Sequence, residues 1–162
     1  MFAGKLQPAV SAVAAQIGSS VGVNLGSNIF DRQVFAGLVT PFGAFTAGRQ
    51  YTPGYLASGS FDVMKTESSL ALGQLVAIPA SFDIRVSNSL QYGLKLNGLT
   101  ATAMYAAGEV AGQTNAGRLL GVMATYKGNG YSFGGGYNTR NNELGEKSLT
   151  SAILGATVDV GP

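Results

Sequence analysis

The sequence RVSNSLQYGLKL, residues 85–96, decides the fold class, because polar and apolar side chains alternate along it. Successive side chains of a β-strand point to opposite faces of a sheet, so this segment is predicted to be a strand. One set of alternate positions runs from Arg85 to Lys95 and is polar apart from a glycine, whereas the intervening positions are mostly apolar. Arg85 and Lys95 are therefore predicted to share a polar face. Asn97-Gly98 follows directly and favours the tight type I′ turn of a β-hairpin.

The same alternation recurs along most of the chain and predicts an antiparallel meander. Further strands are predicted at 32–39, 44–50, 99–107, 120–127, 131–138 and about 148–160. The connections alternate between short ones at 40–43, 97–98 and 128–130 and long ones at about 51–83, 108–117 and 139–147. Alternate connections of a meander lie at the same end, so short turns are predicted at one end and long loops at the other. This layout is typical of an outer-membrane β-barrel.

The composition excludes several classes of function. The 162 residues include no Cys and no His, which excludes a disulfide framework, a thiol nucleophile and a Ser-His-Asp triad. The net charge of +2 is too small to indicate a nucleic-acid partner. We expect no enzymatic activity, no cofactor and no metal site. Charged residues make up only 11%, which suits strands that face lipid on one side and water on the other.

Alternation does not show which face of a barrel points outward. Two alternatives to a channel therefore stay open: a complete eight-stranded outer-membrane barrel with an adhesive or structural role, and a soluble lipid-binding β-barrel with its apolar face inward. Residues 1–26 do not show the alternation of polar and apolar side chains, and they are predicted to form either a short amphipathic helix or a disordered start.

Two of the predicted strands carry motifs of a known family. The sequence FDRQVFAGL at 30–38, followed by FGAFTAGRQYTP at 42–53, resembles the third and fourth strands of Gram-negative general porins, most closely the betaproteobacterial type. The sequence RVSNSLQY at 85–92 resembles the strand after the porin constriction loop. The resemblance covers about residues 27–162, whereas residues 1–26 match poorly.

The resemblance implies a homotrimeric, water-filled barrel of about 16 strands that spans the outer membrane and is surrounded by its lipid. Such a channel passes small hydrophilic solutes and ions without catalysis. The connection at about 52–83 would be the constriction loop, which folds into the channel and narrows it. The chain carries about seven or eight strands, corresponding to roughly strands 3 to 9, so we expect it to form part of a porin barrel.

The resemblance also implies a charged site, in which basic side chains of the barrel wall face acidic side chains of the constriction loop. The expected residues are Arg32, Arg49, Arg85 and Lys95 on the wall, and Asp62 and Glu67 on the loop. Alternation by itself places Arg85 and Lys95 on a polar face, whereas Arg32 and Arg49 share their faces with apolar residues. A surplus of arginine in a narrow channel favours anions, so a weak anion preference is predicted.

Overall fold

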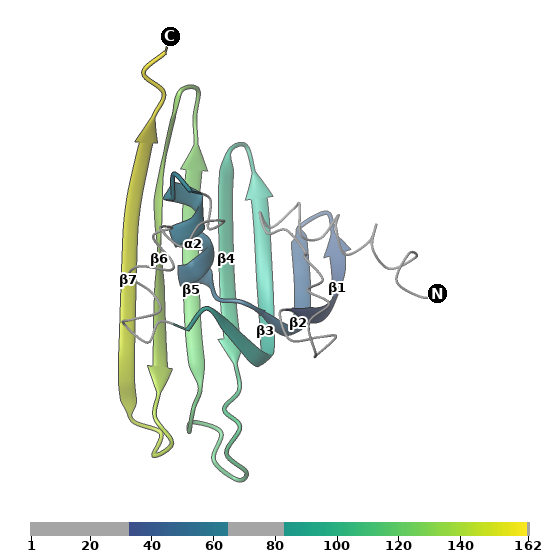
Figure 1. The fold of residues 1–162 in the computed structure, drawn as a ribbon. Helices are drawn as coiled ribbons and strands as arrows, with labels where there is room; N and C mark the ends of the chain where they lie inside the picture. The colour runs from purple at the N-terminus through teal and green to yellow at the C-terminus, as the bar shows by residue number, and fades with distance from the viewer. Residues whose placement is uncertain (1–32, 65–82, 162) are drawn as a thin grey trace.

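The computed structural model describes residues 33–64 and 83–161, which form one antiparallel sheet with a helix on one face (Figure 1). The elements are β1 (Val34–Thr40), β2 (Gly43–Tyr51), α2 (Pro53–Phe61), β3 (Arg85–Leu96), β4 (Leu99–Ala106), β5 (Leu119–Lys127), β6 (Tyr131–Asn141) and β7 (Lys147–Val158). The seven strands lie in the sheet in chain order, so the predicted all-β meander is confirmed. Alternation did not predict α2.

Short and long connections lie at opposite ends of the sheet, as predicted (Figure 1). The short turns are 41–42, 97–98 and 128–130, and the longer connections are 52–84, 107–118 and 142–146. Asn97 has φ 46° and Gly98 has φ 85°, which are the two positive values that a type I′ turn needs. The predicted segment 1–26 lies outside the described residues.

The register of the sheet separates polar from apolar side chains. On the face that carries α2, here called the inner face, Thr46, Gln91 and Asn138 lie in one row across the sheet and are at most 4% exposed. The opposite, outer face exposes large apolar side chains, among them Leu38, Phe45, Leu90, Val122, Phe133 and Leu154. A broad apolar sheet face of this kind is suited to lipid. The arrangement is the reverse of a soluble lipid-binding barrel, whose apolar side chains point inward.

No helix among residues 33–64 and 83–161 is long and apolar enough to cross a membrane.

Helix α2 begins at a well-formed cap. The side chain of Thr52 accepts a hydrogen bond from the backbone N–H of Tyr55 at 3.3 Å, which satisfies a donor that has no partner within the helix. Pro53 occupies the start of the helix, where the fixed φ of proline fits and its missing N–H costs nothing. The helix therefore starts directly after β2 and turns back over the inner face (Figure 1).

Two glycines let α2 lie close to the inner face. A Cβ atom at Gly136 of β6 would stand 2.7 Å from Cβ of Ala57, and one at Gly155 of β7 would stand 2.3 Å from the ring of Phe61. Real Cβ atoms do not approach other atoms this closely, so any side chain at either position must displace the helix. The small residues in these strands therefore form the surface on which the helix packs.

The long-loop ends of β2 and β3 depart from regular pairing at a β-bulge. Gly48 pairs with Ser89, but Gln50 pairs with Val86, so β3 has one extra residue between these pairs. Asn88 lies in this interval with φ 52°, a left-handed conformation that asparagine tolerates better than most residues. Beyond the bulge, Val86 packs against inner-face residues of the next two strands. These are Met104 and Ala106 of β4 and Leu119 of β5.

The bulge overturns the prediction that Arg85 and Lys95 share a face. Val86 pairs with inner-facing Gln50, so Arg85 points to the opposite side of this strand pair. Lys95 pairs with Thr100 on the inner face, next to the short turn at the other end of β3. One extra residue reverses the alternation, and no periodicity count reveals where such a residue lies.

Candidate functional site

Charged side chains line a hollow at the long-loop end of the sheet. Its volume is about 290 Å³, and the polar residues around it are Arg49, Arg85, Ser87, Glu109, Arg140 and Glu143. Three arginines from β2, β3 and β6 thus lie beside two glutamates from the connections at 107–118 and 142–146. Cations and carboxylates around one hollow can order water and small polar solutes.

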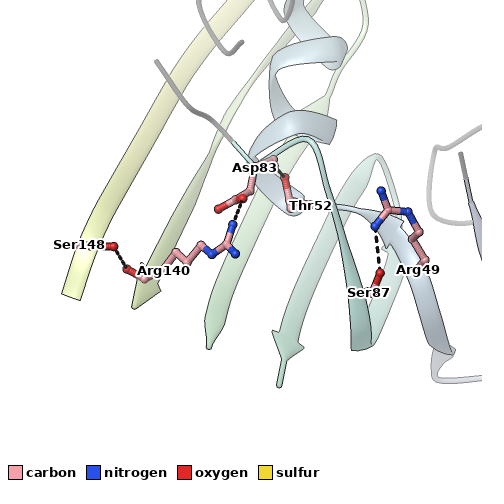
Figure 2. Close-up of polar contacts among 6 residues, drawn as sticks. All are labelled: Arg49, Thr52, Asp83, Ser87, Arg140 and Ser148. Atoms are coloured by element: carbon pink, nitrogen blue, oxygen red, sulfur yellow. Dashed lines mark hydrogen bonds and ion pairs between the residues drawn. The ribbon is translucent and has the colours of Figure 1, made fainter. Parts of the chain in front are cut away.

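The two predicted arginines of the hollow have definite partners. Arg49 Nη1 donates a hydrogen bond to Ser87 Oγ at 2.9 Å, and both side chains extend from the bulged strand pair (Figure 2). The guanidinium of Arg85 lies over the ring of Tyr51, 5.5 Å from its centroid, and Tyr51 stacks in turn on Tyr55 of α2 at 4.9 Å. A guanidinium over an aromatic face is held by the ring quadrupole. The bulged strand pair therefore orients both arginines.

An ion pair connects the end of the long connection to β6. Arg140 Nη1 donates to Asp83 Oδ1 at 2.5 Å, and the side chain of Asp83 is only 13% exposed (Figure 2). Burial raises the pKa of the Asp83 carboxyl above its usual 3.8, although the charge and hydrogen bond of Arg140 act in the opposite direction. Asp83 therefore takes up a proton at a higher pH than an ordinary aspartate.

The structure brings together only part of the predicted basic wall. Arg49 and Arg85 line the hollow, whereas Lys95 lies at the short-turn end of β3. Arg32 lies outside the described residues. Arg140 completes the three arginines, and alternation missed it because the predicted strand ended at residue 138 while β6 runs to Asn141. Extending that strand by two residues would have placed Arg140 on the same face as inner-facing positions of β6.

The acidic partner found in the structure differs from the two predicted ones. Asp62 ends α2, and its Oδ1 accepts a hydrogen bond from the backbone N–H of Met64 at 3.0 Å. Asp62 is not among the residues that line the hollow. Glu67 lies outside the described residues. Asp83 carries the contact with the wall, and its position at the end of the long connection, two residues before Arg85, was the available signal.

Comparison with known proteins assigns the chain to a family. The family profile described as Gram-negative porin matches residues 9–162, which include every strand and helix described above. No curated protein matched the chain. The antiparallel sheet, its apolar outer face and its polar inner face agree with this family. The chain belongs to the Gram-negative porin family and is a channel protein of the outer membrane.

Proposed function

We propose that the protein is a general diffusion porin, through which small hydrophilic solutes and ions pass without catalysis and with a weak preference for anions. The supporting observation is the charged hollow beside the inner face. Three arginines line it against two glutamates, and the carboxylate of Asp83 is directed at one of those arginines. These three arginines are balanced by the two glutamates and Asp83, and Lys95 on the inner face adds the surplus positive charge that attracts anions in a narrow aqueous passage.

The long connection is the proposed constriction. Its described part, α2, packs on the inner face of β5, β6 and β7, which is the face that the proposal assigns to water. A helix in this position narrows the passage beside it. Its backbone is tied to the wall by a hydrogen bond from the N–H of Gly54 to Oδ1 of Asn138 at 3.0 Å.

The outer face is proposed to contact outer-membrane lipid and further copies of the chain in a homotrimer. Leu154 is 91% exposed and Leu38 is 66% exposed on this face. An apolar surface of this width is unfavourable in water and marks a contact with lipid or with another protein. Aromatic side chains gather at its short-turn end, where Tyr126 lies 5.7 Å from Phe133 between ring centroids. Aromatic groups at a strand end are typical of a membrane interface.

Electrophysiology of the protein purified from outer membranes tests the proposal. In planar bilayers under a KCl gradient we expect ohmic channels whose reversal potential indicates a weak preference for chloride. Arg85→Glu should reduce that preference because it reverses one charge of the hollow. Arg118→Glu is the matched control, since Arg118 lies at the same end of the sheet but is not among the lining residues. Absence of conductance, or an equal shift in both variants, would contradict the proposal.

A further inference from the structure

The carboxamide of Gln50 closes a buried hydrogen-bond network at the bulge between β2 and β3. Its Oε1 accepts a hydrogen bond from Thr46 Oγ1 at 2.7 Å, and its Nε2 donates to Ser89 Oγ at 3.1 Å. Nε2 also faces the backbone carbonyls of Thr46 at 3.2 Å and Ser89 at 3.5 Å. Ser89 Oγ donates in turn to the carbonyl of Gly48 at 2.7 Å. Gln50, Thr46 and Ser89 are at most 3% exposed, so these groups depend on one another rather than on bulk water.

The network requires a side chain that both donates and accepts hydrogen bonds. The oxygen of the carboxamide meets a hydroxyl donor, and its nitrogen meets two carbonyls that only a donor can satisfy. A glutamine amide supplies both functions, whereas a carboxylate of the same shape only accepts. Burial alone does not produce such a network. Gln91 is equally buried on the same face, yet its Oε1 has no hydrogen-bond partner in the part of the chain that the structure describes.

The hydrogen bond between Gln50 and Ser89 spans the bulge. Ser89 is the last residue of β3 that is paired on one side of the irregularity, and Gln50 is the first residue of β2 that is paired on the other side. A slip of one residue would move the two groups apart by about 3.3 Å, the rise of one residue in a strand, and break this hydrogen bond. The carboxamide therefore specifies the offset of β2 and β3 at the point where the backbone ladder is interrupted.

Two arginines of the hollow depend on the same offset. Arg49 lies opposite two residues of β3, Ser87 and Asn88, and its guanidinium donates to Ser87 Oγ at 2.9 Å. Arg85 lies just beyond the bulge and is paired with Tyr51, whose ring its guanidinium covers. A different offset would change the partners of both arginines and move them relative to the hollow.

We propose that Gln50 is a positioning residue that determines the anion preference of the channel, although it carries no charge. Its carboxamide fixes the offset of β2 and β3, and that offset places the guanidinium groups of Arg49 and Arg85 at the hollow. The proposal rests on the proposed channel function, because a preference between ions exists only if ions pass. It names a buried neutral side chain, which does not itself line the hollow, as a determinant of selectivity.

Reversal potentials of matched variants test this role. Gln50→Met keeps an unbranched side chain of similar length and removes every hydrogen bond of the carboxamide, so the ratio of chloride to potassium permeability should fall toward one. Gln91→Met is the matched control, because Gln91 is also 2% exposed on the inner face and lies away from the bulge. The control should keep the ratio of the original protein. An unchanged ratio in Gln50→Met, or an equal decrease in both variants, would overturn the proposal.

A background without the two arginines separates positioning from a general structural effect. In the variant Arg49→Gln with Arg85→Gln, the groups that Gln50 places are absent, so the addition of Gln50→Met should change the permeability ratio no further. A disturbance that acts by another route would lower the ratio by the same factor in both backgrounds. That result would also overturn the proposal.

Chemical modification of the arginines gives a readout that does not depend on conductance. Phenylglyoxal reacts with accessible guanidinium groups, and digestion followed by mass spectrometry measures the rate at each arginine. In folded Gln50→Met, Arg49 and Arg85 should react up to about tenfold faster, the factor that corresponds to ~1.4 kcal/mol of lost holding interaction. Arg118, which precedes β5, and Arg140 of β6 should react at their original rates.

A milder variant keeps the proposal testable if Gln50→Met does not fold. Ser89→Ala removes only the hydroxyl that receives the hydrogen bond of Nε2 across the bulge. It should lower the permeability ratio and speed the reaction of Arg49 and Arg85, and unchanged values of both would overturn the proposal. If no variant conducts but Gln50→Met still speeds the reaction of these two arginines and Gln91→Met does not, the channel function fails while the positioning role stands.

Discussion

Asp83 is ion-paired with Arg140 of β6, although β4 and β5 separate β3 from β6 in the sheet. The chain that enters β3 must therefore pass over the inner face before it joins its own place in the sheet. The bulge at Asn88 provides the change of direction, and Val86 packs on the strands beneath. Arg85 is carried on the same bent segment, which places it beside Arg49 at the hollow.

Acidification is expected to increase the anion preference. Because the pKa of Asp83 is raised above 3.8, its carboxylate is neutralised as the pH falls through that raised value, while Arg140 keeps its charge. The reversal potential in a KCl gradient, measured from neutral pH to about pH 4, should move toward chloride selectivity. Asp83→Asn should be more anion-selective at neutral pH and should show a smaller change on acidification. If the reversal potentials of the two proteins change identically with pH, Asp83 is not the group whose protonation changes the selectivity.

Substitution of Gly136 is expected to displace α2. The methyl group of Gly136→Ala would meet Cβ of Ala57 at 2.7 Å and Cα of Gly54 at 3.1 Å, and such overpacking costs about 1–3 kcal/mol. We expect a lower midpoint of thermal unfolding in detergent and a changed single-channel conductance. Ala156→Val is the control, because it adds bulk to the exposed outer face of β7. Equal midpoints for both variants would argue against close packing at Gly136.

A charge on the outer face is expected to prevent membrane insertion. Leu154 of β7 is 91% exposed on this face, and an arginine facing lipid costs about 2–4 kcal/mol near the bilayer centre. Leu154→Arg should therefore reduce the amount of folded protein in outer membranes. Thr157 lies on the inner side of the same strand, so Thr157→Arg should leave the amount of folded protein in outer membranes unchanged. Comparable loss of both variants from the membrane fraction would contradict the assignment of faces.

The bulge is expected to depend on the residue at position 88. Asn88 has φ 52°, so Asn88→Val introduces a β-branched residue into a left-handed conformation, at a cost of about 1–3 kcal/mol. Relief of that strain would change the register beyond residue 88 and displace Arg85 from its place beside Arg49 at the hollow, which lowers the anion preference. Glycine adopts this left-handed conformation readily, so Asn88→Gly should have the same reversal potential and the same midpoint of thermal unfolding as the original protein. A Val variant that matches the Gly variant in both measurements would show that the bulge does not orient Arg85.

Much of the fold could be predicted because alternation and turn chemistry are local. Residues 85–96 alternate cleanly enough to identify a strand, and Asn97-Gly98 specifies its hairpin by the two positive φ values that it tolerates. The separation of short and long connections then follows from the geometry of a meander. None of these inferences requires knowledge of distant contacts.

The site was harder to predict because it depends on distant contacts. Alternation carried past Asn88 puts Arg85 with Lys95, whereas a single bulge separates them. The pairing of Asp83 with Arg140 joins positions far apart in the chain, and each residue by itself resembles a solvated loop charge. Helix α2 was hidden because its stability comes from a threonine cap and from packing on glycines of other strands.

The connection at 52–84 also has a mechanical consequence. Its chain leaves β2, is fastened to β6 and returns to β3, so it braces strands that the backbone ladder links only through their neighbours. A sheet with such a brace cannot flatten or tighten its curvature between β2 and β6 without breaking the contacts of Gly54 or Asp83. Lateral pressure from the surrounding bilayer therefore acts on a stiffened arc of wall, and the cross-section of the passage resists deformation on this side.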